Sequence, residues 1–205
     1  SEKILDALQE LLINKKLQTI SVSEIAQTAG MGKGSIYYYF PSKDAIFEAL
    51  IQRNYQKPLE TAKTLATQTK IPPFTRMAMI FQACTYSSSE FLKQKEPIQA
   101  DVQEKAFLHH RYMNHLITEL KPELAEIIKQ GIESGEIRFD NPAALAEIVL
   151  IVLTVKLDNT LLPSSQTEIE ETIRGLISLL EKGTGIPEGT LNYLSVAAHL
   201  PAPII

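Results

Sequence analysis

The chain has 205 residues, 44% of them hydrophobic, with 20 basic and 24 acidic side chains and a net charge of -4. This composition is that of a globular protein with a substantial core. A single cysteine, Cys84, excludes a disulfide framework and a cysteine-rich zinc site, and suits a reducing compartment. The longest apolar run, residues 148–153, is far shorter than the about 20 residues of a membrane span. No signal-peptide pattern is visible, so we expect a soluble, cytoplasmic protein without membrane contact.

Positive charge is concentrated in one stretch near the N-terminus. Residues 1–54 carry six basic and six acidic side chains, whereas residues 55–205 carry 14 against 18. Between positions 15 and 43, four lysines accompany a single acid, Glu24, which gives a local charge of +3. We expect a small basic face here rather than a polycationic domain.

The first thirty residues predict two helices. Residues 4–12 place apolar side chains at helical spacing with acidic and amide side chains opposite, which indicates an amphipathic helix. Ser21 and Glu24 have the spacing of a capping box, so a second helix begins at this point. It should last about two turns, because Gly30 suits the left-handed position that follows a helix end.

Two more helices follow directly. Residues 33–40 predict a short third helix, which Pro41 stops because proline disfavours helical geometry in the residue before it. Ser42 can cap a fourth helix, whose apolar positions lie within residues 45–50.

Beyond residue 54 the pattern predicts longer helices and no convincing strand, so the fold class is all-α. Lys121-Pro122 should kink or split the central helix. Prolines 201 and 203 favour an extended C-terminal tail, which either covers the body or is a disordered end. The expected helices span about 58–69, 73–93, 97–134, 142–161 and 166–182.

The second and third helices have the arrangement of a helix-turn-helix, in which the second member enters the DNA major groove. Ile36 should anchor the third helix in a small core, and Tyr39 and Phe40 share its face, so we expect both rings to be buried. Tyr38 points the opposite way, toward solvent. Small, polar and tyrosine side chains on the outer face suit contacts with bases and phosphates. The outer face comprises Gly32, Lys33, Gly34, Ser35, Tyr37 and Tyr38.

Residues 20–50, ISVSEIAQTAGMGKGSIYYYFPSKDAIFEAL, resemble the DNA-binding signature of the TetR family of transcriptional regulators. The resemblance implies a helix-turn-helix DNA-binding domain over residues 1–45 and a helical ligand-binding and dimerisation domain over residues 46–205. This sequence departs from the family pattern at Gly32, where a capping Ser or Thr is frequent, and at Tyr39, where His is common. The residues that we expect to contact DNA are Ser21, Ser23, Gly32, Lys33, Gly34, Ser35, Tyr37, Tyr38 and Lys43.

Lys43 can also be interpreted without the family. It stands at the first position of a helix, where the helix dipole favours acids, and a lysine at a helix N-terminus suits a phosphate. The alternative is a solvated surface lysine. If Lys43 binds phosphate, its replacement by alanine should weaken binding to all DNA sequences and make the salt dependence shallower.

The last two long helices carry more apolar surface than one small core requires, with residues 143–157 apolar almost all round. The simpler explanation is an intramolecular core, but in TetR-like proteins these helices form a dimer interface. Two recognition helices must also lie about 34–36 Å apart on DNA, which a homodimer provides. The interface residues that we expect are Leu153, Leu157, Ile169, Ile173, Leu176, Ile177 and Leu180.

Residues 74–113 are rich in methionine and aromatic side chains. Such residues at helical spacing are more often core than pocket, but the resemblance implies a site here for a small-molecule inducer. The candidate lining residues are Met77, Phe81, Cys84, Tyr86, Phe107, His110, Tyr112 and Met113, with Ser87 as a further polar candidate.

His109, His110 and His115 lack the helical spacing of metal ligands, so we expect no metal and no cofactor. No catalytic motif stands out, so the chain is not expected to be an enzyme. The sequence therefore predicts a transcriptional regulator, a repressor released from a palindromic operator by an inducer. The alternatives are a DNA-binding protein of the same fold that acts in chromosome organisation or division control, and an enzyme that turns over a small molecule.

Overall fold

The computed structural model describes residues 2–93, 102–158 and 162–198, although not the side chains of 86–93, 102–109, 158, 197 and 198. The regular structure in these ranges is helical, as the sequence predicts. None of the helices in them has the length and hydropathy that crossing a membrane would require. The elements are α1 (Glu2–Asn14), a 3-10 turn η1 (Leu17–Thr19), α2 (Val22–Thr28), α3 (Lys33–Tyr39), α4 (Lys43–Thr67), α5 (Pro73–Lys93), α6 (Val102–Glu133), α7 (Pro142–Asp158), α8 (Gln166–Thr184) and α9 (Tyr193–Ala198).

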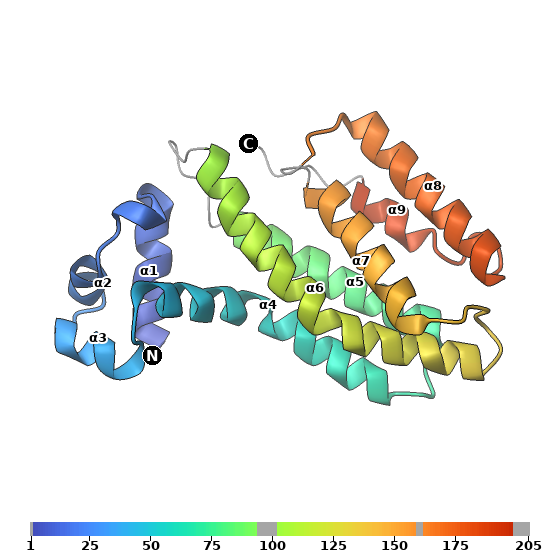
Figure 1. Cartoon of the computed structure of the whole chain (residues 1–205), viewed down its shortest axis with the longest axis horizontal. Coiled ribbons are helices and arrows are strands. Elements are labelled where there is room, and N and C mark those ends of the chain that lie inside the picture. The colour runs from blue at the N-terminus through green and yellow to red at the C-terminus, as the bar shows by residue number, and fades with distance from the viewer. Residues whose placement is uncertain (1, 94–101, 159–161, 199–205) are drawn as a thin grey trace.

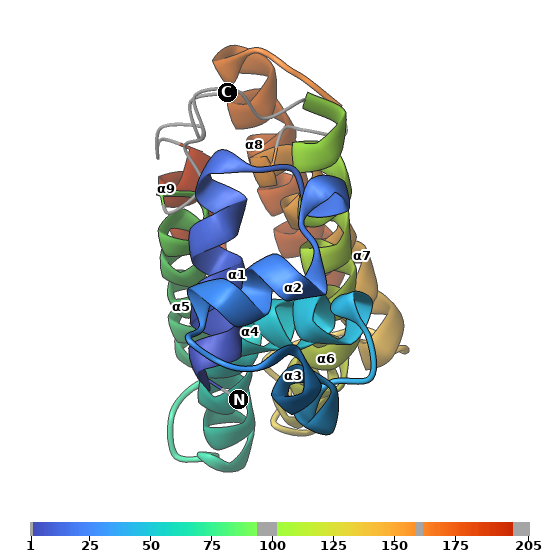
Figure 2. The same cartoon turned by 90° about the vertical axis from the view of Figure 1, so that its left-hand side faces the viewer.

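Two parts of the molecule are joined by α4. Helices α1, α2 and α3 gather at one end of the long axis, and we call residues 2–42 the N-terminal unit (Figure 1). Helices α5 to α9 form the body at the other end. Viewed along the long axis, α1, α2 and α3 lie in front of the first turns of α4 (Figure 2). The expected domain boundary between residues 45 and 46 falls inside α4, so one continuous helix belongs to both parts.

Apolar side chains of different helices pack together in both parts of the molecule. Ile4, Leu8 and Ile25 are fully buried in the N-terminal unit and pack with Ile46 of α4. In the body, α6 packs against α4 and α7, and α4 packs against α5. Leu145, Leu150 and Leu153 give α7 its inward face, which lies against α6. The core thus runs through α4 from one part of the molecule to the other.

Of two expected interruptions, one is absent and the other is a change of direction within one helix. The sequence predicts a new helix near residue 58, but α4 continues through Pro58, which is buried. Likewise α6 continues through Pro122 and is not split, although Figure 1 shows that it changes direction along its length. A proline removes one intrahelical hydrogen bond, and packing of the remaining turns on neighbouring helices offsets that loss.

The C-terminal region contains α9, which the sequence did not predict. It packs against α5 and α8, and the ring of Tyr193 contacts that of Phe81 edge-on with centroids 6.0 Å apart. Residues 199–205, for which prolines favoured an extended tail, lie outside the described residues.

Candidate nucleic-acid interface

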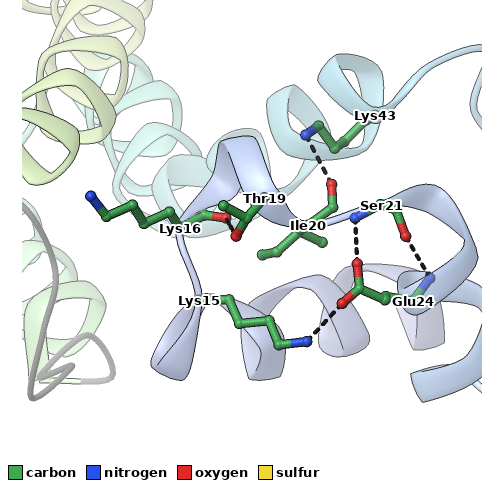
Figure 3. Close-up of polar contacts among 7 residues, drawn as sticks. All are labelled: Lys15, Lys16, Thr19, Ile20, Ser21, Glu24 and Lys43. Atoms are coloured by element: carbon green, nitrogen blue, oxygen red, sulfur yellow. Dashed lines mark hydrogen bonds and ion pairs between the residues drawn. The ribbon is translucent and has the colours of Figure 1, made fainter.

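The start of α2 is fixed by the predicted capping box. The Glu24 backbone amide donates to the Ser21 hydroxyl oxygen at 3.2 Å, and the Ser21 amide donates to the Glu24 carboxylate at 2.8 Å. Lys15 reaches the other carboxylate oxygen at 2.7 Å (Figure 3). The Lys15 contact, followed by those with Ser21, lowers the pKa of Glu24 to about 2. The orientation of α2 is therefore locked by charge-assisted contacts within its first turn.

The turn between α2 and α3 is closed by backbone hydrogen bonds. Gly30 adopts a left-handed φ of 64°, as the sequence predicts. The Gly30 amide donates to the Gln27 carbonyl at 3.1 Å, and the Met31 amide donates to the Ala26 carbonyl at 2.9 Å. This pair of bonds is the Schellman motif, which fixes the direction in which the chain leaves α2.

Helix α3 is anchored by one buried side chain, and its other residues are exposed to solvent. Ile36 is fully buried, whereas Gly32, Lys33, Gly34, Ser35, Tyr37 and Tyr38 are exposed, as expected of the outer face. The Tyr38 side chain is 85% exposed. Gly32 caps the helix without a side-chain hydrogen bond. Added Cβ atoms at Gly32 and Gly34 would meet nothing closer than 3.9 Å, so a second molecule can approach the backbone closely here.

The expected burial of Tyr39 is wrong. Its side chain is 49% exposed, and its ring contacts that of Tyr38 edge-on with centroids 5.2 Å apart. Tyr39 is the last residue of α3, so it lies at the rim of a core that the seven-residue helix reaches mainly through Ile36. Phe40, the next residue, is half-buried and does pack on the core.

The role expected for Lys43 meets a competing arrangement. Its ammonium group donates to the backbone carbonyl oxygens of Leu17, Gln18 and Ile20 at 2.8, 3.2 and 2.9 Å. Figure 3 shows the contact with Ile20. The unfavourable placement of a cation at a helix N-terminus is thus offset by hydrogen bonds to the carbonyls before α2. Contact of Lys43 with a phosphate stays a prediction.

The basic face is consequently smaller than the sequence suggests. Of the four lysines between positions 15 and 43, Lys15 is paired with Glu24 and Lys43 is engaged by carbonyls. Lys33, at the N-terminal end of α3, is exposed next to the two glycines. Ser21 and Ser23 are also exposed, although the Ser21 hydroxyl oxygen already accepts the capping bond.

The candidate lining residues of the inducer site lie on α5 and α6 of the body, and they differ in burial. Met77, Phe81 and Cys84 on α5, and Met113 on α6, are half-buried, whereas Tyr112 is fully buried. Burial raises the pKa of the Cys84 thiol to about 12. His110 is exposed, so its expected role as a polar anchor inside a pocket is wrong. Tyr86, Ser87 and Phe107 lie among the side chains that are not described.

The predicted dimer contacts are also corrected. Six of the seven residues expected at the interface are buried within one chain and form core, whereas Leu157 is half-buried and its contact with a partner stays a prediction. The apolar stripe of α8 turns inward. Other large apolar residues of these two helices are exposed. On α7, Ile148 is 50% and Ile151 is 46% exposed, and on α8, Leu179 is 68% exposed. A stripe marks the more apolar face of a helix, but only tertiary packing decides what covers it.

Several polar residues escaped the sequence analysis because their partners lie far along the chain. Arg76 is 2% exposed and donates to the Leu65 carbonyl at 3.3 Å and to the Gln130 side chain at 2.6 Å. His115, whose spacing from the other histidines did not suit metal ligands, lies with its Nε2 2.7 Å from a carboxylate oxygen of Glu48. Among the described residues, no group of His, Cys, Asp and Glu could hold a metal ion.

Comparison with known proteins agrees with the geometry of α2 and α3. Residues 4–50 match the family model of the bacterial regulatory proteins of the tetR family. Over these residues the chain resembles the TetR family. It is 46% identical over 48 residues to the HTH-type transcriptional regulator EthR of Mycolicibacterium smegmatis, which covers 23% of this chain and 22% of EthR. It is 38% identical over 53 residues to the nucleoid occlusion factor SlmA of Haemophilus ducreyi, 25% of this chain and 26% of SlmA.

These matches span only about a quarter of the length of the curated relatives. The structure of SmeT, the repressor of the Stenotrophomonas maltophilia multidrug efflux pump SmeDEF, aligns with a TM-score of 0.69. It covers 93% of this chain and 92% of SmeT at 13% identity. A complex of SmeT with triclosan aligns with a TM-score of 0.67 at the same identity. At this identity the likeness concerns the fold alone.

Proposed function

We propose that the protein is a ligand-responsive transcriptional regulator, a repressor that binds a palindromic operator through α3. The observation that carries the proposal is the outer face of α3, which is exposed, rich in tyrosine and glycine, and held on a turn of fixed geometry. A short helix presented in this way fits the major groove. The match of residues 4–50 to the TetR family supports this assignment.

The DNA contacts that we propose are the exposed residues of this face together with the two serines before it. Tyr37, Tyr38 and Ser35 would contact the DNA from α3, and Lys33 and Gly34 would lie against the bases at its N-terminal end. Gly32 lies just before them, Ser21 caps the N-terminus of α2, and Ser23 lies in the first turn of that helix. The contact of Lys43 with a phosphate would require it to leave the carbonyls.

A homodimer is part of the proposal, through surfaces different from those expected. On α7, Ile148 and Ile151 lie on the side opposite the buried Leu145, Leu150 and Leu153. This helix is therefore apolar on two sides, although one chain covers only one of them. A second copy seated on Ile148, Ile151 and Leu179 of α8 would cover the exposed side and supply the second recognition helix.

The ligand is proposed to bind in the body between α5 and α6. Met77, Phe81, Cys84, Tyr112 and Met113 come from these two helices and offer the apolar environment that a small organic molecule needs. The binding of triclosan to SmeT, which shares the fold, supports a site for a small apolar molecule. Ligand binding would favour a conformation in which the two α3 helices no longer match the half-site spacing.

The test is binding of the purified protein to DNA from its own upstream region, against random competitor, across a salt series. We expect tight, competitor-resistant binding that weakens steeply as salt rises. Tyr38→Ala should weaken this binding about tenfold without unfolding the protein, because the ring is 85% exposed. Asn14→Ala, at an exposed position that ends α1, is the matched control and should leave the affinity unchanged.

The second candidate is a DNA-binding protein of chromosome organisation or division control. The similarity to the nucleoid occlusion factor SlmA over 53 residues supports this candidate. Genome-wide mapping of bound sites separates the two functions. Many dispersed sites would support the second candidate, and one or a few promoter-proximal sites would support the regulator.

A further inference from the structure

A cluster of charged and aromatic side chains joins α4 to α6 and plays no part in the DNA-contacting face. Glu48 of α4 lies between the side chains of Arg111 and His115 on α6. One carboxylate oxygen is paired with the Arg111 guanidinium, and the other lies 2.7 Å from His115 Nε2. The ring of Tyr55, two turns further along α4, stacks on that of His115 with centroids 6.0 Å apart. Glu48 is therefore held from both sides by the body.

Other charges on α4 are directed to the N-terminal unit. Lys43 binds the carbonyls of Leu17, Gln18 and Ile20, as described above. Arg53 binds the carboxylates of Glu2 and Asp6 on α1 at 3.1 and 2.6 Å. These contacts join both the turn before α2 and the length of α1 to the first three turns of α4.

The spacing of the three charged residues separates these attachments. Lys43, Glu48 and Arg53 are five residues apart along α4. At about 100° per residue, each step turns by about 140° around the helix axis. Lys43 and Arg53 therefore lie about 80° apart, and Glu48 lies on the side opposite to both. One side of α4 is attached to the N-terminal unit and the other to α6.

We propose that Glu48 is a positioning residue through which α6 fixes the orientation of the N-terminal unit relative to the body. Lys43 and Arg53 make the N-terminal unit turn together with α4, so a rotation or tilt of α4 moves α3 as well. The Glu48 contacts with Arg111 and His115 oppose that movement, because it would separate the carboxylate from both of its partners on α6. The consequence for operator binding rests on the function proposed above.

The first experiment measures this orientation directly and needs no DNA. Spin labels are placed on cysteines at Asn14, which ends α1, and Lys129 of α6, both exposed, in a Cys84→Ala background. Labelled chains are diluted with excess unlabelled protein so that only distances within one chain are counted. The native chain should give one narrow distance distribution, and Glu48→Ala should give a broader or displaced one.

The matched control is Glu60→Ala. Glu60 is an exposed glutamate of the same helix, and it accepts a hydrogen bond from Gln56 one turn earlier. This variant should reproduce the native distance distribution. Circular dichroism and thermal unfolding verify that each variant is folded, and Glu48→Gln, which keeps the size of the side chain, replaces Glu48→Ala if the latter unfolds. An unchanged distribution in a folded Glu48 variant would overturn the proposal.

The second experiment uses operator DNA. Glu48→Ala should weaken operator binding about tenfold while leaving the slope of affinity against salt unchanged, because Glu48 neutralises no phosphate. Arg111→Gln should have a similar effect, and the double variant should be no weaker than the stronger single variant, since both changes break the same contact. Additive losses would contradict a shared positioning contact.

Failures of the two proposals are distinguishable. If no variant, nor the native chain, binds operator DNA, the proposed function fails, whereas the distance measurement still decides the role of Glu48. If operator binding is normal and the distances do not respond to Glu48→Ala, the positioning role fails and the regulator remains.

Discussion

The ammonium group of Lys43 has three carbonyl oxygens as hydrogen-bond acceptors, from Leu17, Gln18 and Ile20. Nothing in the local sequence reveals these acceptors, since they lie 23 to 26 residues earlier in the chain. A cation at a helix N-terminus is unfavourable without a partner, so the sequence correctly indicated that Lys43 has one. The partner that the structure supplies lies within the chain.

We expect Lys43→Ala to lower the free energy of unfolding by about 1–2 kcal/mol, because three carbonyl groups lose a charged donor. Urea titration followed by circular dichroism measures the change. Lys33→Ala, at an exposed lysine of α3, is the control and should have little effect. If Lys43 instead moves to a phosphate on DNA, its replacement will make the salt slope shallower by about 0.9.

Cys84 should be unreactive in the folded protein. Burial raises the pKa of its thiol to about 12, so almost no thiolate is present at pH 8, and the thiolate is the reactive form. Alkylation by iodoacetamide should be slow at pH 8 and should become fast in denaturing urea. Rapid alkylation of the native protein would contradict the burial of this thiol.

At the scale of elements, the local signals were sufficient for α2 and α3. Ser21 and Glu24 form the predicted capping box, and Gly30 closes the predicted turn. Each of these signals acts within a few residues, so the sequence contains both partners. The extent of α4 was harder to predict, because Pro58 is tolerated only where other helices support the remaining turns.

Two helix glycines should respond in opposite ways to replacement by alanine. A Cβ at Gly131 of α6 would lie 2.6 Å from Cδ1 of the buried Ile137, so Gly131→Ala should destabilise the protein by about 1–3 kcal/mol. Gly183 of α8 faces open space, so Gly183→Ala should stabilise it by about 0.5–1 kcal/mol through helix propensity. Thermal unfolding of both variants tests the pair. Equal shifts in one direction would contradict the packing at Gly131.

At the scale of the whole molecule, α7 shows why an interface is not predicted by apolar content alone. All but one of the residues expected to meet a partner fill the core, whereas Ile148 and Ile151 remain exposed. Both sets are apolar and lie on the same helices. Only the positions of α6 and α8 around α7 determine which set the single chain covers.

We therefore expect the double variant Ile148→Arg/Ile151→Arg to be a folded monomer with weakened operator binding. Both side chains are about half exposed, so charges there should disturb association rather than the core of one chain. Sedimentation at micromolar concentration measures the state. Met79→Arg, at an apolar residue of α5 that is 44% exposed, is the matched control and should remain a dimer. A dimeric double variant would place the interface elsewhere.

The sequence by itself determined the all-α class, the capping box of α2, the turn at Gly30 and the outward direction of Tyr38. These features depend on hydrogen bonds and helical periodicity over a few residues, so both partners of each interaction are close together in the sequence. Tertiary structure alone decided the carbonyl contacts of Lys43, the exposure of Tyr39, the inward stripe of α8 and the cluster around Glu48. In each of these cases the deciding neighbours belong to another element, and their approach depends on how helices distant in the sequence pack together.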